Sequence, residues 1–326
     1  ASFISWGNQF YTIIRTQLMW VYVLGLLVVL AAIITTQYRI DINAAYKRLK
    51  KYDVKVVSSS LGKISYMDEG TGEAILISHG IFGGYDQAYM SLKTLVSADF
   101  RKIAPSRFGY PGSDVPPNPT PRNQAKAFLD LLNQLGIEKA YVISTSAGGA
   151  AGIMFASSYP ERVKGLILLS SGVPTSKKSR EEITGMMGPP AVFVNDFPIW
   201  FVTKYFGFVF RAMFASEIDK SLYETMLPVV PRKKGIKIDE TITNLDMDLN
   251  YDDYEVERIT APVLVVHAKD DPMAKYDSVE RFIARIHAKT AVFETGGHLI
   301  TGHGDAVSVA IKKFIDETKQ RESVMI

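Results

Sequence analysis

A serine between small residues is the first candidate for covalent chemistry in this chain. Residues 142–149 read VISTSAGG, so an apolar run ends at a serine and a segment rich in Ala and Gly follows. The pattern is typical of a strand, a sharp turn and a helix, in which the central residue, here Ser146, projects above a sheet. Ser144 stands where Gly is usual. Because short matches of this kind also occur by chance, Ser146 is a candidate nucleophile that needs partners elsewhere.

Residues that could serve such a serine follow two later apolar runs. A serine hydroxyl is a weak nucleophile until a base removes its proton, and that base is usually a His oriented by a carboxylate. Asp270 and Asp271 follow one apolar run, and His298 follows the last one. His303 lies a little further on and competes with His298 for the role of base. The residues thus occur in the order Ser, Asp, His, with two candidates each for the acid and the base.

A glycine-rich segment adds a third element of the same chemistry. Residues 79–84 read HGIFGG and follow a compact apolar run. Glycines let backbone N–H groups face a cavity, and such groups stabilise the negative oxygen that forms when a carbonyl is attacked. The alternative is an ordinary glycine-rich turn.

These residues need a scaffold in which strands and helices alternate. Apolar runs bounded by turn formers predict strands at 54–58, 63–68, 74–78, 100–105, 139–145, 164–169, 262–268 and 290–294. Helical periodicity predicts helices at 123–135, 147–158, 278–286 and 305–318. Such alternation is the signature of a mostly parallel sheet flanked on both faces by helices, which is an α/β fold.

The alternation stops between about 174 and 253, which predicts a helical cap inserted over the sheet. Residues 197–214 are dense in aromatic side chains, and an apolar cap suits an apolar substrate. We expect Phe82, Trp200 and Phe201 to contact that substrate. The aromatic side chains could instead pack the cap onto the sheet domain or touch a lipid bilayer.

An apolar segment near the amino terminus predicts a membrane anchor. Residues 18–34 are uncharged and almost wholly apolar, long enough at about 1.5 Å per residue to cross the hydrocarbon core of a bilayer. Trp20, Tyr22 and Tyr38 flank the segment, as interface-seeking aromatic residues do. A buried core helix would show a polar face, and a cleaved signal peptide would have a shorter apolar region. We therefore expect a single-pass transmembrane helix, with residues 1–52 as anchor and juxtamembrane segment.

Basic residues set the expected orientation of this anchor. Arg15 alone stands close before the apolar segment, whereas five basic residues follow it: Arg39, Lys47, Arg48, Lys50 and Lys51. The positive-inside rule then places the large carboxy-terminal domain in the cytoplasm. The lysines could also belong to an amphipathic helix, at about 43–51, that lies on anionic lipid.

Composition excludes several other classes of function. The 326 residues include 37 Lys and Arg against 34 Asp and Glu, and a net charge of only +3 argues against a nucleic-acid surface. The sequence contains no Cys, which excludes disulfides, thiol catalysis and thiolate metal sites. We find no metal-ligand cluster and no dinucleotide or Walker-type loop, and therefore expect no metal and no cofactor.

Together the motifs resemble those of the α/β-hydrolase superfamily. The order Ser, Asp, His along the chain is the one this superfamily shows. The loop at 107–113 fits the same pattern, and the run at 79–84 with Asp86 and Gln87 looks like a group of bacterial hydrolases of poorly defined substrate. The resemblance implies a capped, esterase- or lipase-like domain at 53–320.

The resemblance also implies a role for each site residue. It makes Ser146 the nucleophile, His298 the base and Asp271 the acid that orients the base, since the family spacing from the preceding strand selects Asp271 over Asp270. It further implies that the backbone N–H groups of Ile81 and Ala147 form the oxyanion hole.

The nucleophile type narrows the expected reaction. A serine at this turn argues against epoxide hydrolases and dehalogenases, which normally carry Asp there. We expect hydrolysis of a carboxylic ester with a hydrophobic acyl or lipid-like chain, through an acyl-enzyme intermediate. A C–C bond hydrolase, an acyltransferase and a non-catalytic ligand-binding or scaffolding protein are the alternatives. The expected partners are a small hydrophobic ester and membrane lipid.

Overall fold

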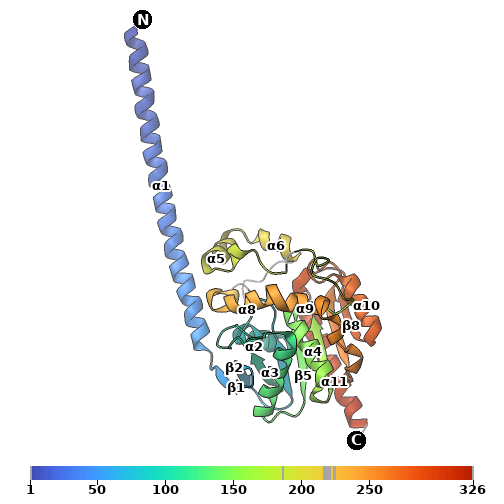
Figure 1. The fold of residues 1–326 in the computed structure, drawn as a ribbon. Helices are drawn as coiled ribbons and strands as arrows, with labels where there is room; N and C mark the ends of the chain where they lie inside the picture. The colour runs from blue at the N-terminus through green and yellow to red at the C-terminus, as the bar shows by residue number, and fades with distance from the viewer. Residues whose placement is uncertain (1, 186, 216–221, 223–224, 325–326) are drawn as a thin grey trace.

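The computed structural model describes residues 2–185, 187–215, 222 and 225–324, which form one long helix and an α/β domain (Figure 1). Within these residues, an eight-stranded sheet has the order β1-β2-β4-β3-β5-β6-β7-β8. Its strands are β1 (Lys55–Ser59), β2 (Gly62–Glu69), β3 (Ala74–Ser78), β4 (Arg101–Pro105), β5 (Ala140–Thr145), β6 (Val163–Leu169), β7 (Val263–Ala268) and β8 (Lys289–Phe293). Each range agrees within one residue at either end with the strand predicted from the sequence.

Most neighbouring strands of this sheet run parallel. The six strands from β4 to β8 in sheet order are parallel to one another, whereas β2 is antiparallel to both of its neighbours, β1 and β4. The prediction of a mostly parallel sheet is therefore confirmed. Because parallel strands end at the same edge, the loops after β3, β5, β7 and β8 all begin at one edge of the sheet.

Helices cover both faces of the sheet, and the strand residues alternate between two apolar cores. Leu76 and Val142 belong to the core that is covered by α3 (Pro121–Gln134), α4 (Gly149–Ser158) and α10 (Tyr276–Ile286). Ile75 and Ile143 belong to the opposite core, covered by α2 (Tyr85–Leu95) and α11 (Gly304–Val324). This alternation is the period of two that a β-strand imposes on its side chains. Helix α2 is absent from the sequence-based prediction.

The segment between β6 and β7 contains helices rather than strands in its described part. These are α5 (Asp196–Tyr205), α6 (Phe208–Phe214), α8 (Lys233–Ile238), a π-helical turn (Asp239–Thr243) and α9 (Asn244–Leu249). They lie together across one side of the domain (Figure 1). A buried ion pair between Arg232 of this segment and Asp86 of α2 ties the segment to the sheet domain.

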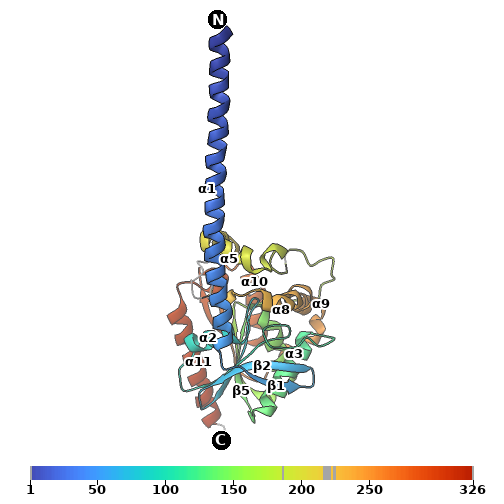
Figure 2. The same ribbon diagram turned by 90° about the vertical axis from the view of Figure 1, so that its left-hand side faces the viewer.

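The amino-terminal segment forms one continuous helix, α1 (Ser2–Lys51), that projects away from the domain (Figures 1 and 2). Among the described residues, the part of α1 from Ile14 to Lys51 is long enough to cross a membrane and contains an 18-residue stretch of high hydropathy. The helix considered at 43–51 is not separate but is the carboxy-terminal end of α1. There Ile42, Ala45 and Leu49 are buried against the domain, because they lie on one helical face.

Candidate active site

Ser146 lies on a sharp turn between β5 and α4. Its backbone φ is 48°, in the left-handed region that residues with a side chain rarely adopt. Such a conformation costs about 1–3 kcal/mol and persists only where the surrounding structure fixes it. The turn is tight, because a Cβ at Gly148 would lie 2.2 Å from the carbonyl oxygen of Ser78. The expected strand–turn–helix geometry is therefore present around Ser146.

The structure explains why Ser can replace Gly at position 144. Ser144 is buried, and its Oγ has no hydrogen-bond partner. It faces Gly152 of α4, where an added Cβ would lie 1.8 Å from Ser144 Oγ. The Ser144 side chain, which the usual glycine would not have, thus occupies the space that Gly152 leaves free on the facing helix.

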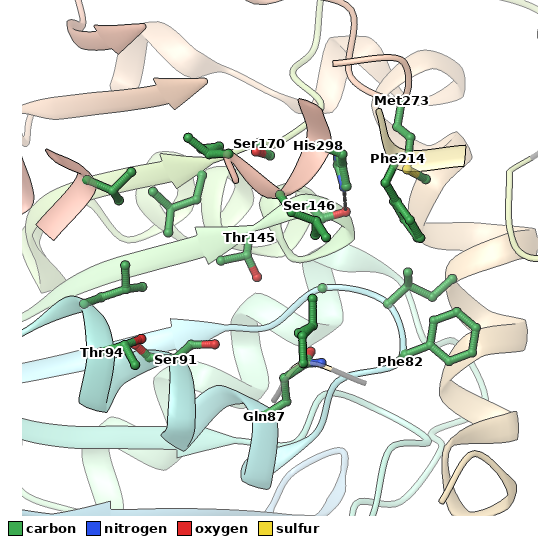
Figure 3. Close-up of a pocket in the computed structure, with 18 of the residues that line it drawn as sticks. Phe82, Gln87, Ser91, Thr94, Thr145, Ser146, Ser170, Phe214, Met273 and His298 are labelled. Carbon is green, nitrogen blue, oxygen red and sulfur yellow. Dashed lines mark hydrogen bonds between the residues drawn. The ribbon is translucent and has the colours of Figure 1, made fainter. Parts of the chain in front are cut away.

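Ser146, His298 and Asp271 form a continuous hydrogen-bonded chain. Ser146 Oγ and His298 Nε2 are 2.8 Å apart (Figure 3), and His298 Nδ1 and Asp271 Oδ2 are 2.9 Å apart. Because Asp271 accepts at Nδ1, that nitrogen carries the proton and Nε2 is left to accept the proton of the serine. The three residues follow β5, β8 and β7, which end at the same edge of the sheet.

Asp271 is held in its ionised form. Burial raises the pKa of the Asp271 carboxyl, but the hydrogen bond and charge of His298 and the backbone N–H groups of Ala274 and Met273 outweigh it, so the net pKa is lowered. Oδ1 accepts those two N–H groups at 3.0 and 2.8 Å. Oδ2 is thereby left for the imidazole.

The two rival residues have other contacts. The Asp270 carboxylate accepts the backbone N–H groups of Gly297 at 2.8 Å and Gly296 at 3.2 Å, so it holds the turn that presents His298. The His303 ring stacks on Phe293, with ring centroids 4.2 Å apart. The structure therefore brings Asp271 and His298, rather than their rivals, to Ser146.

His79 is fixed in one neutral tautomer beneath the glycine-rich loop. Its Nε2 accepts the Arg107 backbone N–H at 3.0 Å, so Nδ1 carries the proton and donates to the Gly80 carbonyl at 2.8 Å. Burial, and secondly the positive charge of Arg107, hold the pKa of His79 well below its usual range. Both ring nitrogens are occupied, and His79 is thus a loop-shaping residue.

Arg107 connects this loop to the helical segment between β6 and β7. Its guanidinium makes two hydrogen bonds to the Asp239 carboxylate, of 2.7 and 2.6 Å, and its Nε donates to the His79 carbonyl at 2.8 Å. The Tyr110 hydroxyl donates to the same carboxylate at 2.5 Å. The sequence pointed to the loop at 107–113 but carried no signal for Asp239, because its partner lies far away along the chain.

A cavity of about 310 Å³ opens at Ser146. Phe82 and Ile81 line it from the glycine-rich loop, and Phe214 of α6 lines it from beside the histidine (Figure 3). The Phe214 ring stacks on the His298 imidazole, with centroids 6.2 Å apart and planes inclined by 20°. A further wall comes from α2, the helix missing from the prediction, through Gln87, Ser91 and Thr94.

The positions of Trp200 and Phe201 correct the expectation that they contact substrate. Neither lines the cavity at Ser146. The Trp200 indole instead donates to Asp41 of α1 at 2.8 Å, and Phe201 packs against Trp200 and Tyr205. Trp200 thus belongs to the contact between this segment and α1, whereas Phe82 lines the cavity.

The two predicted oxyanion donors lie at the site. Ile81 lines the cavity, and Ala147 is the residue that follows Ser146 at the turn into α4. Since the first N–H groups of a helix have no partner inside it, the Ala147 N–H can donate a hydrogen bond beside Ser146.

Comparison with known families places this architecture. A family model described as the alpha/beta hydrolase fold matches residues 73–302, which is more than half of the chain. The chain belongs to the α/β-hydrolase fold family. The family assignment covers the strand before the glycine-rich loop, the serine turn and the loops that carry Asp271 and His298.

Curated relatives of this α/β-hydrolase share part of its sequence. It is 36% identical over 123 residues to an uncharacterized hydrolase, YcgS, of Bacillus subtilis, covering 37% of this chain and 42% of the relative. It is also 36% identical over 114 residues to a 2-hydroxy-6-oxo-6-phenylhexa-2,4-dienoate hydrolase of Comamonas testosteroni, covering 33% of this chain and 40% of the relative. The matches thus span about two fifths of each relative's length.

A solved structure supports the fold of this α/β-hydrolase along most of the chain. An alpha/beta hydrolase fold protein from Nakamurella multipartita superposes with a TM-score of 0.63 at 24% identity, and the match covers 80% of this chain and 98% of that one. At this identity the likeness establishes the fold alone. The expected α/β-hydrolase fold is therefore confirmed.

Proposed function

We propose that this α/β-hydrolase is a serine hydrolase of neutral, hydrophobic carboxylic esters. The observation that carries the proposal is the chain of hydrogen bonds from Ser146 through His298 to Asp271. His298 Nε2 takes the proton of the Ser146 hydroxyl as its oxygen attacks the ester carbonyl, and Asp271 stabilises the imidazolium that forms. His298 then gives the proton to the departing alcohol, which leaves an acyl group on Ser146.

The second half of the reaction reuses the same groups. His298 deprotonates a water molecule that attacks the acyl carbon, and the protonated imidazole returns a proton to Ser146 as the acid leaves. In both halves the N–H groups of Ile81 and Ala147 bind the negative oxygen. Removing one such donor costs about 10²–10³-fold in turnover in enzymes of this kind.

The lining of the cavity supports a neutral substrate. Its described residues are apolar or uncharged apart from the imidazole, and they include no Lys, Arg, Asp or Glu. Phe82, Phe214, Met226 and Ile300 supply apolar surface, whereas a charged ligand group buried there would lack a counter-ion. An acyl or alkyl chain therefore suits this cavity better than a carboxylate.

C–C bond hydrolysis is a second candidate, because a relative is named as a 2-hydroxy-6-oxo-6-phenylhexa-2,4-dienoate hydrolase. Such a reaction would use the same serine turn and the same histidine to attack a ketone carbonyl. A dienoate is negatively charged, however, and the described cavity wall offers no cation to bind it. The cavity thus favours the ester, and the relative favours the C–C bond.

We further propose that α1 anchors the enzyme in a membrane as a single-pass helix. The side chains of residues 14–33 are exposed, and they are almost wholly apolar after Arg15, which is costly in water but favourable in lipid. The basic residues after the span favour a cytoplasmic domain. In this proposal residues 1–52 are the anchor, 53–320 form the enzyme with its cap at about 174–253, and lipid and a small ester are the partners.

The substrate assignment is tested with the full-length enzyme in detergent micelles. Activity is measured on p-nitrophenyl esters of increasing acyl length and on 2-hydroxy-6-oxo-6-phenylhexa-2,4-dienoate, with Ser146→Ala as the blank. The proposal expects ester hydrolysis that improves as the acyl chain lengthens, and no Ser146-dependent loss of the dienoate. Rapid cleavage of the dienoate with poor ester hydrolysis would establish the second candidate instead.

A further inference from the structure

Helix α1 is fixed against α5 by a set of polar contacts beyond its apolar stretch. Asp41 of α1 accepts the Trp200 indole N–H at 2.8 Å and the Lys204 ammonium at 2.5 Å. Below it, the Tyr46 hydroxyl donates to Asp196 at 3.0 Å. These hydrogen bonds join α5 to successive positions of α1. The position of an α5 residue along the axis of α1 can therefore be given by the α1 residue that it contacts.

Measured in this way, α5 ends just beyond the apolar stretch. The Tyr205 hydroxyl donates to the Gln37 side chain of α1, and the Tyr38 ring contacts the Phe197 ring with centroids 5.1 Å apart. Gln37 follows the last apolar residue, Ile34, by about 4.5 Å along the helix axis. Tyr205 and Phe197 therefore lie about one helical turn from the apolar stretch, the depth at which membrane proteins concentrate their aromatic residues.

Four aromatic side chains between residues 197 and 208 are exposed to solvent and form what we call the cap aromatic face: Phe197 (43% exposed), Tyr205 (43%), Phe206 (41%) and Phe208 (66%). Ring contacts make the surface continuous. The Phe201 ring contacts the rings of Phe197, Tyr205 and Phe206, and the ring centroids of Phe206 and Phe208 are 6.1 Å apart. Contiguous exposed aromatic surface of this kind marks an interaction site.

We propose that the cap aromatic face is a second membrane contact, which lies in the boundary between headgroups and acyl chains beside the anchor. The inference rests on the proposed anchoring by α1, and it assigns the lipid bilayer as the occupant of the face. The level of the face along α1 favours lipid over a protein partner. Tyr205 also has the amphipathic character of interfacial residues, with an apolar ring and a polar tip.

This contact brings the catalytic cavity close to the bilayer. Helix α6 begins at Phe208 in the cap aromatic face and ends at Phe214, whose ring lines the cavity and stacks on His298. Six residues of α-helix span about 9 Å. A hydrophobic ester dissolved in the membrane would therefore have a short path to Ser146.

The proposal is tested by fluorescence quenching in vesicles, for which the absence of Cys from the sequence makes single labelling sites available. Phe208→Cys and Phe206→Cys carry an environment-sensitive fluorophore in the full-length protein, reconstituted in phosphatidylcholine vesicles with and without lipid that bears a nitroxide on its acyl chain. Val309→Cys on α11 is the matched control, because Val309 is also 66% exposed. Leu24→Cys, within the apolar stretch, reports on the anchor itself.

The proposal expects the nitroxide lipid to quench the labels at 24, 206 and 208, and to leave the label at 309 unquenched. Quenching at 24 without quenching at 206 or 208 would overturn the membrane contact and leave the anchor standing. A blue-shifted but unquenched label at 208 would show that protein covers the face, which also overturns it. Absence of quenching at 24 would refute the anchor, and the inference with it.

Discussion

An added Cβ at Gly152 of α4 would lie 1.8 Å from the Oγ of Ser144, which is buried on β5 without a hydrogen-bond partner. Where β5 packs against α4, next to Ser146, the side chain present at position 144 thus fits only because position 152 has none. The exchange accounts for a serine in the place where the family's turn usually has glycine, and it makes the two residues energetically dependent on each other.

Gly152→Ala should destabilise the protein by about 1–3 kcal/mol, because it overpacks this contact. In a Ser144→Gly background the clash is gone, so the same change should be neutral or stabilising by up to about 1 kcal/mol, as expected for Gly to Ala within a helix. Chemical denaturation gives the unfolding free energies of the wild-type protein, the two single variants and the double variant, and from these the coupling energy between the two positions. Equal effects of Gly152→Ala in both backgrounds would contradict the account.

Asp271→Asn should lower the rate of ester hydrolysis by orders of magnitude, since an amide no longer holds the His298 tautomer. The corresponding change costs about 10⁴-fold in a serine protease. Asp270→Asn is the matched control, because Asp270 holds only the turn at Gly296 and Gly297, and it should cost far less. Single-turnover acylation measures both, with circular dichroism as the check on folding. The reverse ranking would transfer the role of acid to Asp270.

Arg232→Met should destabilise the fold by about 3–5 kcal/mol, because it leaves the Asp86 carboxylate buried without its partner. The two side chains are 0% and 1% exposed and lie 2.7 Å apart. Arg122→Met is the control, since Arg122 and Asp253 are 56% and 55% exposed and such a pair contributes about 0–1 kcal/mol. Thermal unfolding compares the stability of the Arg232→Met and Arg122→Met variants. Similar losses of stability in both would show that the buried ion pair does not hold the cap against the sheet domain.

Stability should decrease as the pH falls below the ordinary His pKa of 6.5, because His79 is neutral in the folded protein. Burial, then the Arg107 charge, hold the His79 pKa well below 6.5, so below that pH the unfolded chain binds a proton that the folded chain does not. The loss reaches about 1.4 kcal/mol per pH unit for one proton. His267, with a pKa also lowered by burial, acts in the same direction.

The unfolding free energy of the His79→Gln variant should therefore fall less steeply between pH 6.5 and 5 than that of the wild-type protein. Of the two histidines with a lowered pKa, only His267 remains in this variant. Denaturation curves at a series of pH values measure the slope. An unchanged slope in the His79→Gln variant would mean that His79 takes up protons equally in the folded and unfolded states.

The elements around the site could be predicted because their signals are local. Each strand is an apolar run bounded by turn formers, and the runs that end at Ser78 and Thr145 deliver the glycine-rich loop and Ser146. Helix α2 was missed because residues 85–95 are of mixed polarity and follow Gly84, which offers no side-chain cap. The cavity residues Gln87, Ser91 and Thr94 were missed with it.

The arrangement of the cap could not be predicted, because its contacts join residues far apart in the sequence. Only the folded chain brings Arg232 into an ion pair with Asp86, and the Trp200 indole into a hydrogen bond with Asp41. An aromatic run is compatible with contact to substrate, to protein or to lipid, and composition does not distinguish among them. Trp200 was assigned to substrate on that basis, whereas its indole contacts α1.

The central claim, that Ser146 is an activated nucleophile, is tested most directly by covalent labelling. The full-length protein is treated with a fluorophosphonate probe, and peptide mass spectrometry identifies the modified residue, with Ser146→Ala treated in parallel. The account predicts one modified residue, Ser146, no labelling in the variant, and loss of ester hydrolysis approaching the 10⁶-fold or so seen when a serine protease loses its nucleophile. Labelling at another serine, or full hydrolysis by a folded Ser146→Ala variant, would contradict it.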